Sequence, residues 1–185
     1  LCVEWMLVKA IERAKALTAT GVELSCSEAL HFFLKNQLTL SDFETNNTAI
    51  QHFSNLDDID VFAALKTWKT TSDHVLSFLC NAILNRHLFK IEMYNEAVLP
   101  QKLTALKQSA AAHFNLSEEE ASWLVFQGST YNHAYNAKHA TIKVIDQKGT
   151  VQNAENISEH LEATVLSEKV VKHFVCYPKE LLQAS

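Results

Sequence analysis

The strongest constraint on this chain is a succession of short apolar segments that each begin directly after a Ser or an Asp. The segments are EALHFFLKN after Ser27, DFETNNTAIQHF after Ser41, IDVFAALKTW after Asp57 and Asp58, and HVLSFLCNAILNR after Ser72 and Asp73. Side-chain oxygens of Ser and Asp accept hydrogen bonds from the free amides at a helix start. The pattern therefore predicts a run of short helices joined by brief loops, as in a helical bundle.

The opening segment adds another amphipathic helix, which we expect to end near Gly21. Its apolar residues recur at helical spacing: Val3, Leu7, Ala10, Ile11, Ala14 and Leu17. With only 3 Gly and 2 Pro in 185 residues, the chain has little material for tight turns, so helix is the default expectation. The chain begins at Leu1 inside this helical pattern, which looks like a cut within a longer protein.

The last third of the chain has a different residue pattern. Pro100 begins a further helical stretch, and Ser117 stands before a capping-box-like SEEE. From Gln127 onward, β-branched and aromatic residues alternate in places, at 140–146 and 170–177. We predict a mainly α fold, a bundle of about six to seven helices with a small C-terminal β-sheet. Residues 1–125 would form the helical part, and 126–185 a small α+β tail packed on it.

Charge and cysteine content restrict the partners. A formal net charge of −5 provides no general field for a nucleic-acid backbone or an anionic membrane. No apolar run approaches the roughly 18 residues of a membrane span. The four cysteines, Cys2, Cys26, Cys80 and Cys176, show no CxxC spacing and indicate reduced thiols in a cytoplasmic protein.

The acidic and histidine residues do not form a recognisable metal site. Asp57, Asp58 and Asp60 resemble a carboxylate cluster, but their place at a helix start favours interaction with the helix dipole. His173 and Cys176 are three apart in a predicted strand, where they would point to opposite faces. We therefore expect no zinc site.

Aromatic residues mark a possible contact surface in the predicted sheet. Tyr131, His133 and Tyr135 alternate and would share one strand face. Such a face can contact a base or ring, and the alternative is ordinary packing within the sheet.

Arg86 and Lys90 are the candidate binding residues. If the helix continues through them, they lie one turn apart on one face, where like charges repel unless an anion sits between them. Polyphosphate would suit that geometry. The alternative is that cations near a helix C-terminus are favoured by the dipole and point to water.

Residues 55–92 carry a family resemblance. The words LDDIDVFAALKTW and NRHLFK resemble the C-terminal region of HD-superfamily phosphohydrolases, which include bacterial deoxynucleoside triphosphate triphosphohydrolases and the human sterile-alpha-motif and HD-domain enzyme. MLVKAIERAKAL looks like the helix after the last active-site segment of that family, and FLKNQLTLSDFE fits the connection. The resemblance covers about residues 1–95. Beyond them the chain is similar only in general terms to the tails of bacterial members.

The resemblance implies a metal-dependent hydrolase of phosphate esters, often acting on dNTPs and often oligomeric. In the vertebrate relative, the Arg and Lys of the matching RNLFK word contact regulatory nucleotide at subunit interfaces, which makes Arg86 and Lys90 candidate nucleotide contacts. His87 stands where the family word has Asn.

The family holds its divalent metal with a His, a His-Asp pair and a further Asp, and this sequence contains no His-Asp dipeptide. Asp73-His74 has the reverse order, and helix capping explains it. We expect the metal in an HD core outside this chain, and no catalysis by this chain alone.

Two functions remain open from sequence. The chain is either part of such an enzyme or a non-catalytic helical module for oligomerisation or partner binding. A nucleic-acid-binding role has no basic stripe or recognition-helix pattern to support it.

Overall fold

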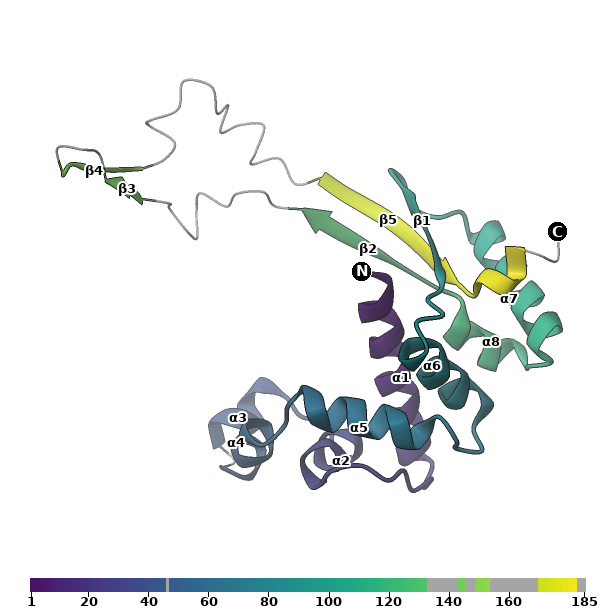
Figure 1. The fold of residues 1–185 in the computed structure, drawn as a ribbon, viewed down its shortest axis with the longest axis horizontal. Coiled ribbons are helices and arrows are strands. Elements are labelled where there is room, and N and C mark those ends of the chain that lie inside the picture. Colours follow the sequence, from purple (N-terminus) through teal and green to yellow (C-terminus); the bar gives the residue numbers. More distant parts are fainter. Residues whose placement is uncertain (46, 133–142, 146–148, 154–169, 183–185) are drawn as a thin grey trace. The chain divides into compact units, whose positions relative to one another are not determined.

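The computed structural model describes residues 1–45, 47–132, 143–145, 149–153 and 170–182, and helices dominate its N-terminal two thirds (Figure 1). The helices are α1 (Cys2–Ala19), α2 (Glu28–Lys35), α3 (Leu40–Thr45), α4 (Asn47–Ser54), α5 (Asp58–Trp68), α6 (His74–Leu84), α7 (Pro100–Phe114), α8 (Glu118–Leu124) and the 3-10 helix η2 (Lys179–Leu182). The strands are β1 (Lys90–Tyr94), β2 (Phe126–Asn132), β3 (Lys143–Ile145), β4 (Val151–Asn153) and β5 (Val170–Tyr177). The predicted helical fold with a small sheet is confirmed, with eight α-helices in the described residues.

Side-chain caps begin α2, α5, α6 and α8 where the sequence predicts them. Ser27 Oγ accepts from the Leu30 amide at 3.3 Å, and Asp73 Oδ1 accepts from the Leu76 amide at 2.8 Å. Ser117 caps α8 in a reciprocal capping box. These bonds satisfy amides that have no partner inside the helix, so the caps determine where each helix starts.

The segment after Ser41 differs from the prediction of one capped helix. The chain forms two short helices here, and α3 begins at Leu40, before Ser41. Asp42 Oδ2 accepts hydrogen bonds from the amide and the hydroxyl of Thr39, at 2.6 and 2.7 Å. The stabilising carboxylate therefore belongs to Asp42 and reaches back to the preceding Thr.

The buried face of α1 is offset from the predicted one. Met6, Ala10 and Ala14 are fully buried and lie four residues apart on one side of the helix. Val3, part of the predicted face, is 40% exposed. α1 packs against α6 and α2. The buried face of α1 includes these two alanines because small side chains allow neighbouring helices to approach closely.

α5 and α6 supply most of the remaining helical core. α6 buries six residues, among them Leu79 and Cys80, and α5 buries its C-terminal end around Trp68. The indole of Trp68 donates to the Ser25 carbonyl at 3.0 Å. Its single polar group is thus satisfied in the core, as burial of an indole requires.

Large apolar side chains stay exposed on α3, α4 and the first half of α5. We call these residues the exposed apolar set: Leu40 (79% exposed), Ile50 (44%), Phe53 (63%), Ile59 (76%) and Phe62 (49%). No helix within the described part of the chain has the length and apolarity to cross a membrane.

Strands β1, β5 and β2 form a three-stranded sheet with β5 in the middle. Contacts divide the chain into two compact units. Unit 1 comprises Leu1–Glu92, Leu99–Phe126 and Val175–Ser185, and unit 2 comprises Met93–Val98 and Gln127–Phe174. The units do not follow a single cut in the sequence, and the division at residue 125 into a helical part and a tail stays a prediction.

Unit 2 contains the β3–β4 pair, which is antiparallel with Val144 opposite Gln152. Gly128 approaches the Phe174 ring so closely that a Cβ would lie 2.6 Å from its Cζ atom. Phe174 is fully buried. Only glycine therefore fits at position 128 without movement of the ring.

Candidate functional site

The candidate site at Arg86 and Lys90 begins with a left-handed turn that ends α6. The Arg86 amide donates to the Ile83 carbonyl at 3.2 Å, and the His87 amide donates to the Ala82 carbonyl at 2.8 Å. This is the Schellman pattern, and Arg86 has φ 60° at the position that glycine usually occupies. The helix stops before Arg86. The condition under which Arg86 and Lys90 would lie one turn apart, a helix that continues through both, is therefore not met.

Both cations are nevertheless available to a ligand. Lys90 begins β1, and its side chain and that of Arg86 are exposed. Neither side chain has a hydrogen bond or ion pair to another residue in the part of the chain that the structure describes. Two unpaired cations at the end of α6 are free to meet an anion. Their role as nucleotide contacts stays a prediction.

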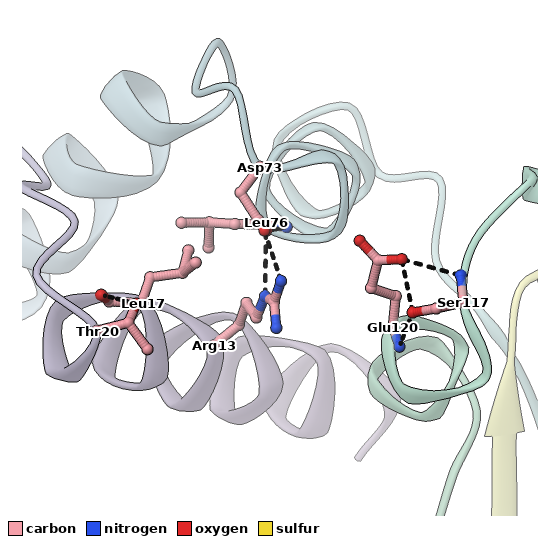
Figure 2. Close-up of polar contacts among 7 residues, drawn as sticks. All are labelled: Arg13, Leu17, Thr20, Asp73, Leu76, Ser117 and Glu120. Atoms are coloured by element: carbon pink, nitrogen blue, oxygen red, sulfur yellow. Dashed lines mark hydrogen bonds and ion pairs between the residues drawn. The ribbon is translucent and has the colours of Figure 1, made fainter.

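The start of α6 is held by an ion pair to α1 (Figure 2). Arg13 Nε and Nη2 lie 3.2 and 2.6 Å from the two carboxylate oxygens of Asp73, and both side chains are 14% exposed. Burial acts to raise the pKa of Asp73, but hydrogen bonds from Arg13 and the Leu76 amide outweigh it and lower the pKa. Asp73 therefore caps α6 and anchors it to α1 with one carboxylate.

Aromatic rings extend this anchor to α8. Arg13 lies 5.5 Å from the ring centroid of Trp123, and Lys9 lies 5.8 Å from the centroids of both Trp123 and Phe126. Cations over aromatic faces at these distances attract the ring quadrupole. The right-hand part of Figure 2 shows the capping box of α8. In it the Glu120 carboxylate accepts hydrogen bonds from the amide and the hydroxyl of Ser117. These contacts connect α1 to the start of α6 and to α8, whereas Arg86 follows the other end of α6.

The acidic residues near α5 cap the helix, as predicted. Asp57 Oδ1 accepts from the Ile59 amide at 2.7 Å and from the Asp60 amide at 3.2 Å. Asp60 Oδ2 accepts from the Asp57 amide at 2.9 Å, and this bond lowers the pKa of Asp60. Across the described residues, no group of three or more His, Cys, Asp or Glu side chains is placed to hold a metal ion.

Two of the pockets among the described residues lie in unit 1, and neither of these two is lined by Arg86 or Lys90. A polar pocket of about 420 Å³ is lined by Ser27, Glu28, Ala29, Gln51, His52, Asn55 and Asp60. A mostly apolar pocket of about 380 Å³ is lined by His74, Phe78, Phe114, Asn115, Leu116 and Leu124. In the polar pocket, Ser27 Oγ serves as the cap of α2 and Asp60 belongs to the capping box of α5, so we assign no reaction to either pocket.

The aromatic strand face can be followed only at Tyr131, which lies in β2 and is 59% exposed. His133 and Tyr135 lie outside the described residues. His173 and Cys176 both belong to β5, where Cys176 is fully buried and His173 is partly exposed.

Sequence reasoning missed one side-chain cluster. Cys176 Sγ lies 3.5 Å from Cys2 Sγ, although the two residues are 174 positions apart. Cys26 and Cys80 are free thiols elsewhere in unit 1. Because no spacing in the sequence relates Cys2 to Cys176, only the fold could reveal this pair.

Comparisons with known proteins place this geometry in context. No family model matches the chain. The uncharacterized protein YwfO of Bacillus subtilis is 22% identical over 187 aligned residues, which cover 97% of this chain and 40% of YwfO. The crystal structure of a phosphohydrolase from Bacteroides thetaiotaomicron matches with a TM-score of 0.83 and 35% identity, over 95% of this chain and 44% of that protein. The chain thus spans less than half the length of either protein and shares its fold with a segment of a phosphohydrolase.

Proposed function

We propose that this chain is the C-terminal part of an HD-type, metal-dependent phosphohydrolase that acts on nucleotides in the cytoplasm. The observation that carries the proposal is the match to the Bacteroides phosphohydrolase, at a TM-score of 0.83 and 35% identity. The words that resemble the HD superfamily lie on α5 and at the end of α6. These helices are held by the caps and the ion pair described above, so the resemblance falls on well-packed elements.

The residues of this chain do not fit the divalent metal that such an enzyme needs. The sequence has no His-Asp dipeptide, and the described residues offer no cluster of metal ligands. We therefore assign no catalytic step to these side chains. In our proposal, the metal that activates water is held by residues of a longer protein, and the helices here support that core.

Arg86 and Lys90 are proposed to contact nucleotide phosphates between subunits of a homo-oligomer. Arg86 occupies a left-handed conformation that costs an ordinary residue on the order of 1 kcal/mol and that glycine adopts freely. An arginine there does not benefit the turn. Its exposed guanidinium, with no carboxylate partner among the described residues, supports a role toward an external anion.

The test of the enzyme proposal compares the full-length protein with the 185-residue chain in dNTP hydrolysis, with and without manganese. We expect metal-dependent release of triphosphate or phosphate from the full-length protein alone. Activity of the short chain would contradict the assignment of the metal site. Full-length protein that is inactive on dNTPs and on other phosphate esters would overturn the proposal.

The nucleotide contacts have a separate test. The double variant R86A/K90A of the full-length protein should bind dGTP at least tenfold more weakly, since each lost charge-assisted contact costs about 1–2 kcal/mol. Lys66→Ala, which removes an exposed lysine from α5, is the matched control and should leave binding unchanged. Equal effects of the two variants would eliminate Arg86 and Lys90 as nucleotide contacts.

The exposed apolar set favours a second candidate, a helical module for oligomerisation or partner binding. Large apolar side chains that gather on the surface mark interaction sites more often than isolated ones do. Ile59→Lys should reduce self-association in light scattering, and Leu99→Lys, at another exposed leucine, should not. A monomeric wild type, or equal behaviour of the two variants, would count against self-association through this set.

A further inference from the structure

The fold brings together two thiols from opposite ends of the chain. Cys2 is the first residue of α1, and Cys176 lies near the end of β5. Both belong to unit 1, and their sulfur atoms are 3.5 Å apart. This separation is that of two thiols in contact, without a covalent bond.

The surroundings of the two sulfurs differ. Cys176 is fully buried, whereas Cys2 is partly exposed. Cys2 Sγ also lies 3.3 Å from the Phe89 carbonyl oxygen and 3.9 Å from Met6 Sδ. A small oxidant from solvent can therefore reach the sulfur of Cys2, whereas the sulfur of Cys176 is not accessible to it.

The two thiols also differ in pKa, and Cys2 has the lower value. A hydrogen bond from Cys176 and the charge of Lys179 lower the pKa of Cys2, against the opposing effect of burial. The Cys2 thiolate and burial raise the pKa of Cys176. Since the thiolate is the nucleophile, Cys2 is the more reactive thiol of the pair, and Cys176 is the one that holds its proton.

We propose that Cys2 and Cys176 form a reversible dithiol–disulfide pair that responds to peroxides, with Cys2 as the attacking thiol and Cys176 as the resolving thiol. The geometry that supports it is the sulfur contact between a partly exposed and a buried cysteine. The inference is independent of the proposed hydrolase activity.

The reaction balances with hydrogen peroxide as the oxidant. The Cys2 thiolate attacks one peroxide oxygen, the O–O bond breaks, and hydroxide leaves and takes a proton to become water. The sulfur of Cys176 then attacks the Cys2 sulfenic acid. The S–O bond breaks, the S–S bond forms, and the oxygen leaves with the thiol proton as a second water. Two thiols and one peroxide thus give one disulfide and two waters.

Closing the bond requires only a local movement. The sulfurs must approach from 3.5 Å to about 2.0 Å. Cys2 sits in the first turn of α1, where rotation about χ1 shifts its sulfur without breaking interior helix bonds.

The other two cysteines provide matched controls. Cys26 is partly exposed like Cys2, but burial and Asp60 raise its pKa. Burial raises the pKa of Cys80 to about 12. Neither has another thiol within hydrogen-bonding distance among the described residues. Both should react with peroxide much more slowly than Cys2.

The experiment treats the reduced protein with stoichiometric hydrogen peroxide, alkylates the remaining thiols and identifies the products by peptide mass spectrometry. We expect a Cys2–Cys176 linked peptide that disappears on reduction, with Cys26 and Cys80 alkylated. In Cys176→Ser, dimedone should trap a sulfenic acid on Cys2. Cys26→Ser should behave as wild type, and Cys2→Ser should form no linkage.

Three results would overturn the proposal, and the first two need no variant. In the wild type, Cys2 could remain alkylatable after peroxide treatment, or the linkage could involve Cys26 or Cys80 instead. In the third result, the Cys176→Ser variant has native circular dichroism, but its Cys2 does not react with dimedone.

Discussion

The two helical regions on either side of Leu56 use similar residues with opposite results. The C-terminal end of α5 and the apolar residues of α6 are buried almost completely, as Trp68 and Leu79 show. α3 buries no residue, and α4 buries only Ala49, although both carry Phe and Leu or Ile side chains. The Phe rings of this region contact one another, as Phe43 and Phe53 do with centroids 5.9 Å apart, yet Phe53 remains 63% exposed.

The difference lies in the partners of each helix. α6 packs against α1, α5 and α8, so its apolar residues are enclosed on several sides. α3 and α4 contact each other, α4 contacts α2, and Phe43 of α3 stacks on Phe33 of α2 with ring centroids 6.4 Å apart. Apolar content alone therefore does not distinguish the core of this chain from a surface that is available to a partner.

The largest expected effect is a loss of stability on removal of a core ring. Trp68→Ala should lower the free energy of unfolding by about 3–5 kcal/mol, because it leaves a cavity beside Leu65 and orphans the Ser25 carbonyl. Phe53→Ala should cost less than about 1 kcal/mol. Urea unfolding followed by circular dichroism measures both. Similar losses would mean that α4 belongs to the cooperative core.

The next effect compares two carboxylates at helix starts. Asp73→Ala removes a cap and leaves Arg13 without its partner in a largely buried place, which should cost about 2–4 kcal/mol. Asp42→Ala removes an exposed carboxylate at the start of α3 and should cost clearly less than Asp73→Ala. Thermal unfolding of the two variants beside the wild type tests the ranking. The reverse order would show that the ion pair to α1 contributes little.

Acid should reduce the difference in unfolding free energy between the wild type and Asp73→Ala. The folded-state pKa of Asp73 is lowered from 3.8, so its carboxylate stabilises the protein above pH 3.8, and this contribution is lost as pH falls through the lower folded value. Between these values the unfolded chain binds more protons. We expect a constant difference in unfolding free energy from pH 5 to 7 that shrinks below about pH 4. A gap that widens in acid would contradict the pKa direction.

The smallest expected effect is a gain in the free energy of unfolding from a substitution in the turn that ends α6. Arg86→Gly should stabilise the protein by about 0.5–1 kcal/mol, because glycine adopts the left-handed conformation without strain. Asn115, with φ 51°, ends α7 in the same conformation, and Asn tolerates it better. Asn115→Gly should therefore gain less. A loss of stability in Arg86→Gly would show that the arginine side chain supports the turn.

Local chemistry allowed most helix starts to be predicted. Ser27, Asp57, Asp73 and Ser117 act as caps because each cap needs only a side-chain oxygen and amides two or three residues away. The change to strands after Leu124 follows from β-branched and aromatic residues. The buried face of α1 was predicted less well, because apolar residues nearly surround that helix and only its neighbours select which of them is enclosed.

The candidate site shows the same limit. Arg86 and Lys90 are recognisable in the sequence, but whether the helix continues through them could not be predicted, because a Schellman turn on a non-glycine residue has no clear sequence signal.

The sequence by itself determined the helical class, the caps and the absence of a His-Asp dipeptide, since each depends on residues close together in the chain. Tertiary structure alone decided which apolar residues are buried, that Arg13 meets Asp73 across 60 positions, and that Cys2 meets Cys176 across 174. Such contacts depend on how helices and strands pack, and neither composition nor periodicity encodes the distance between residues far apart in the chain.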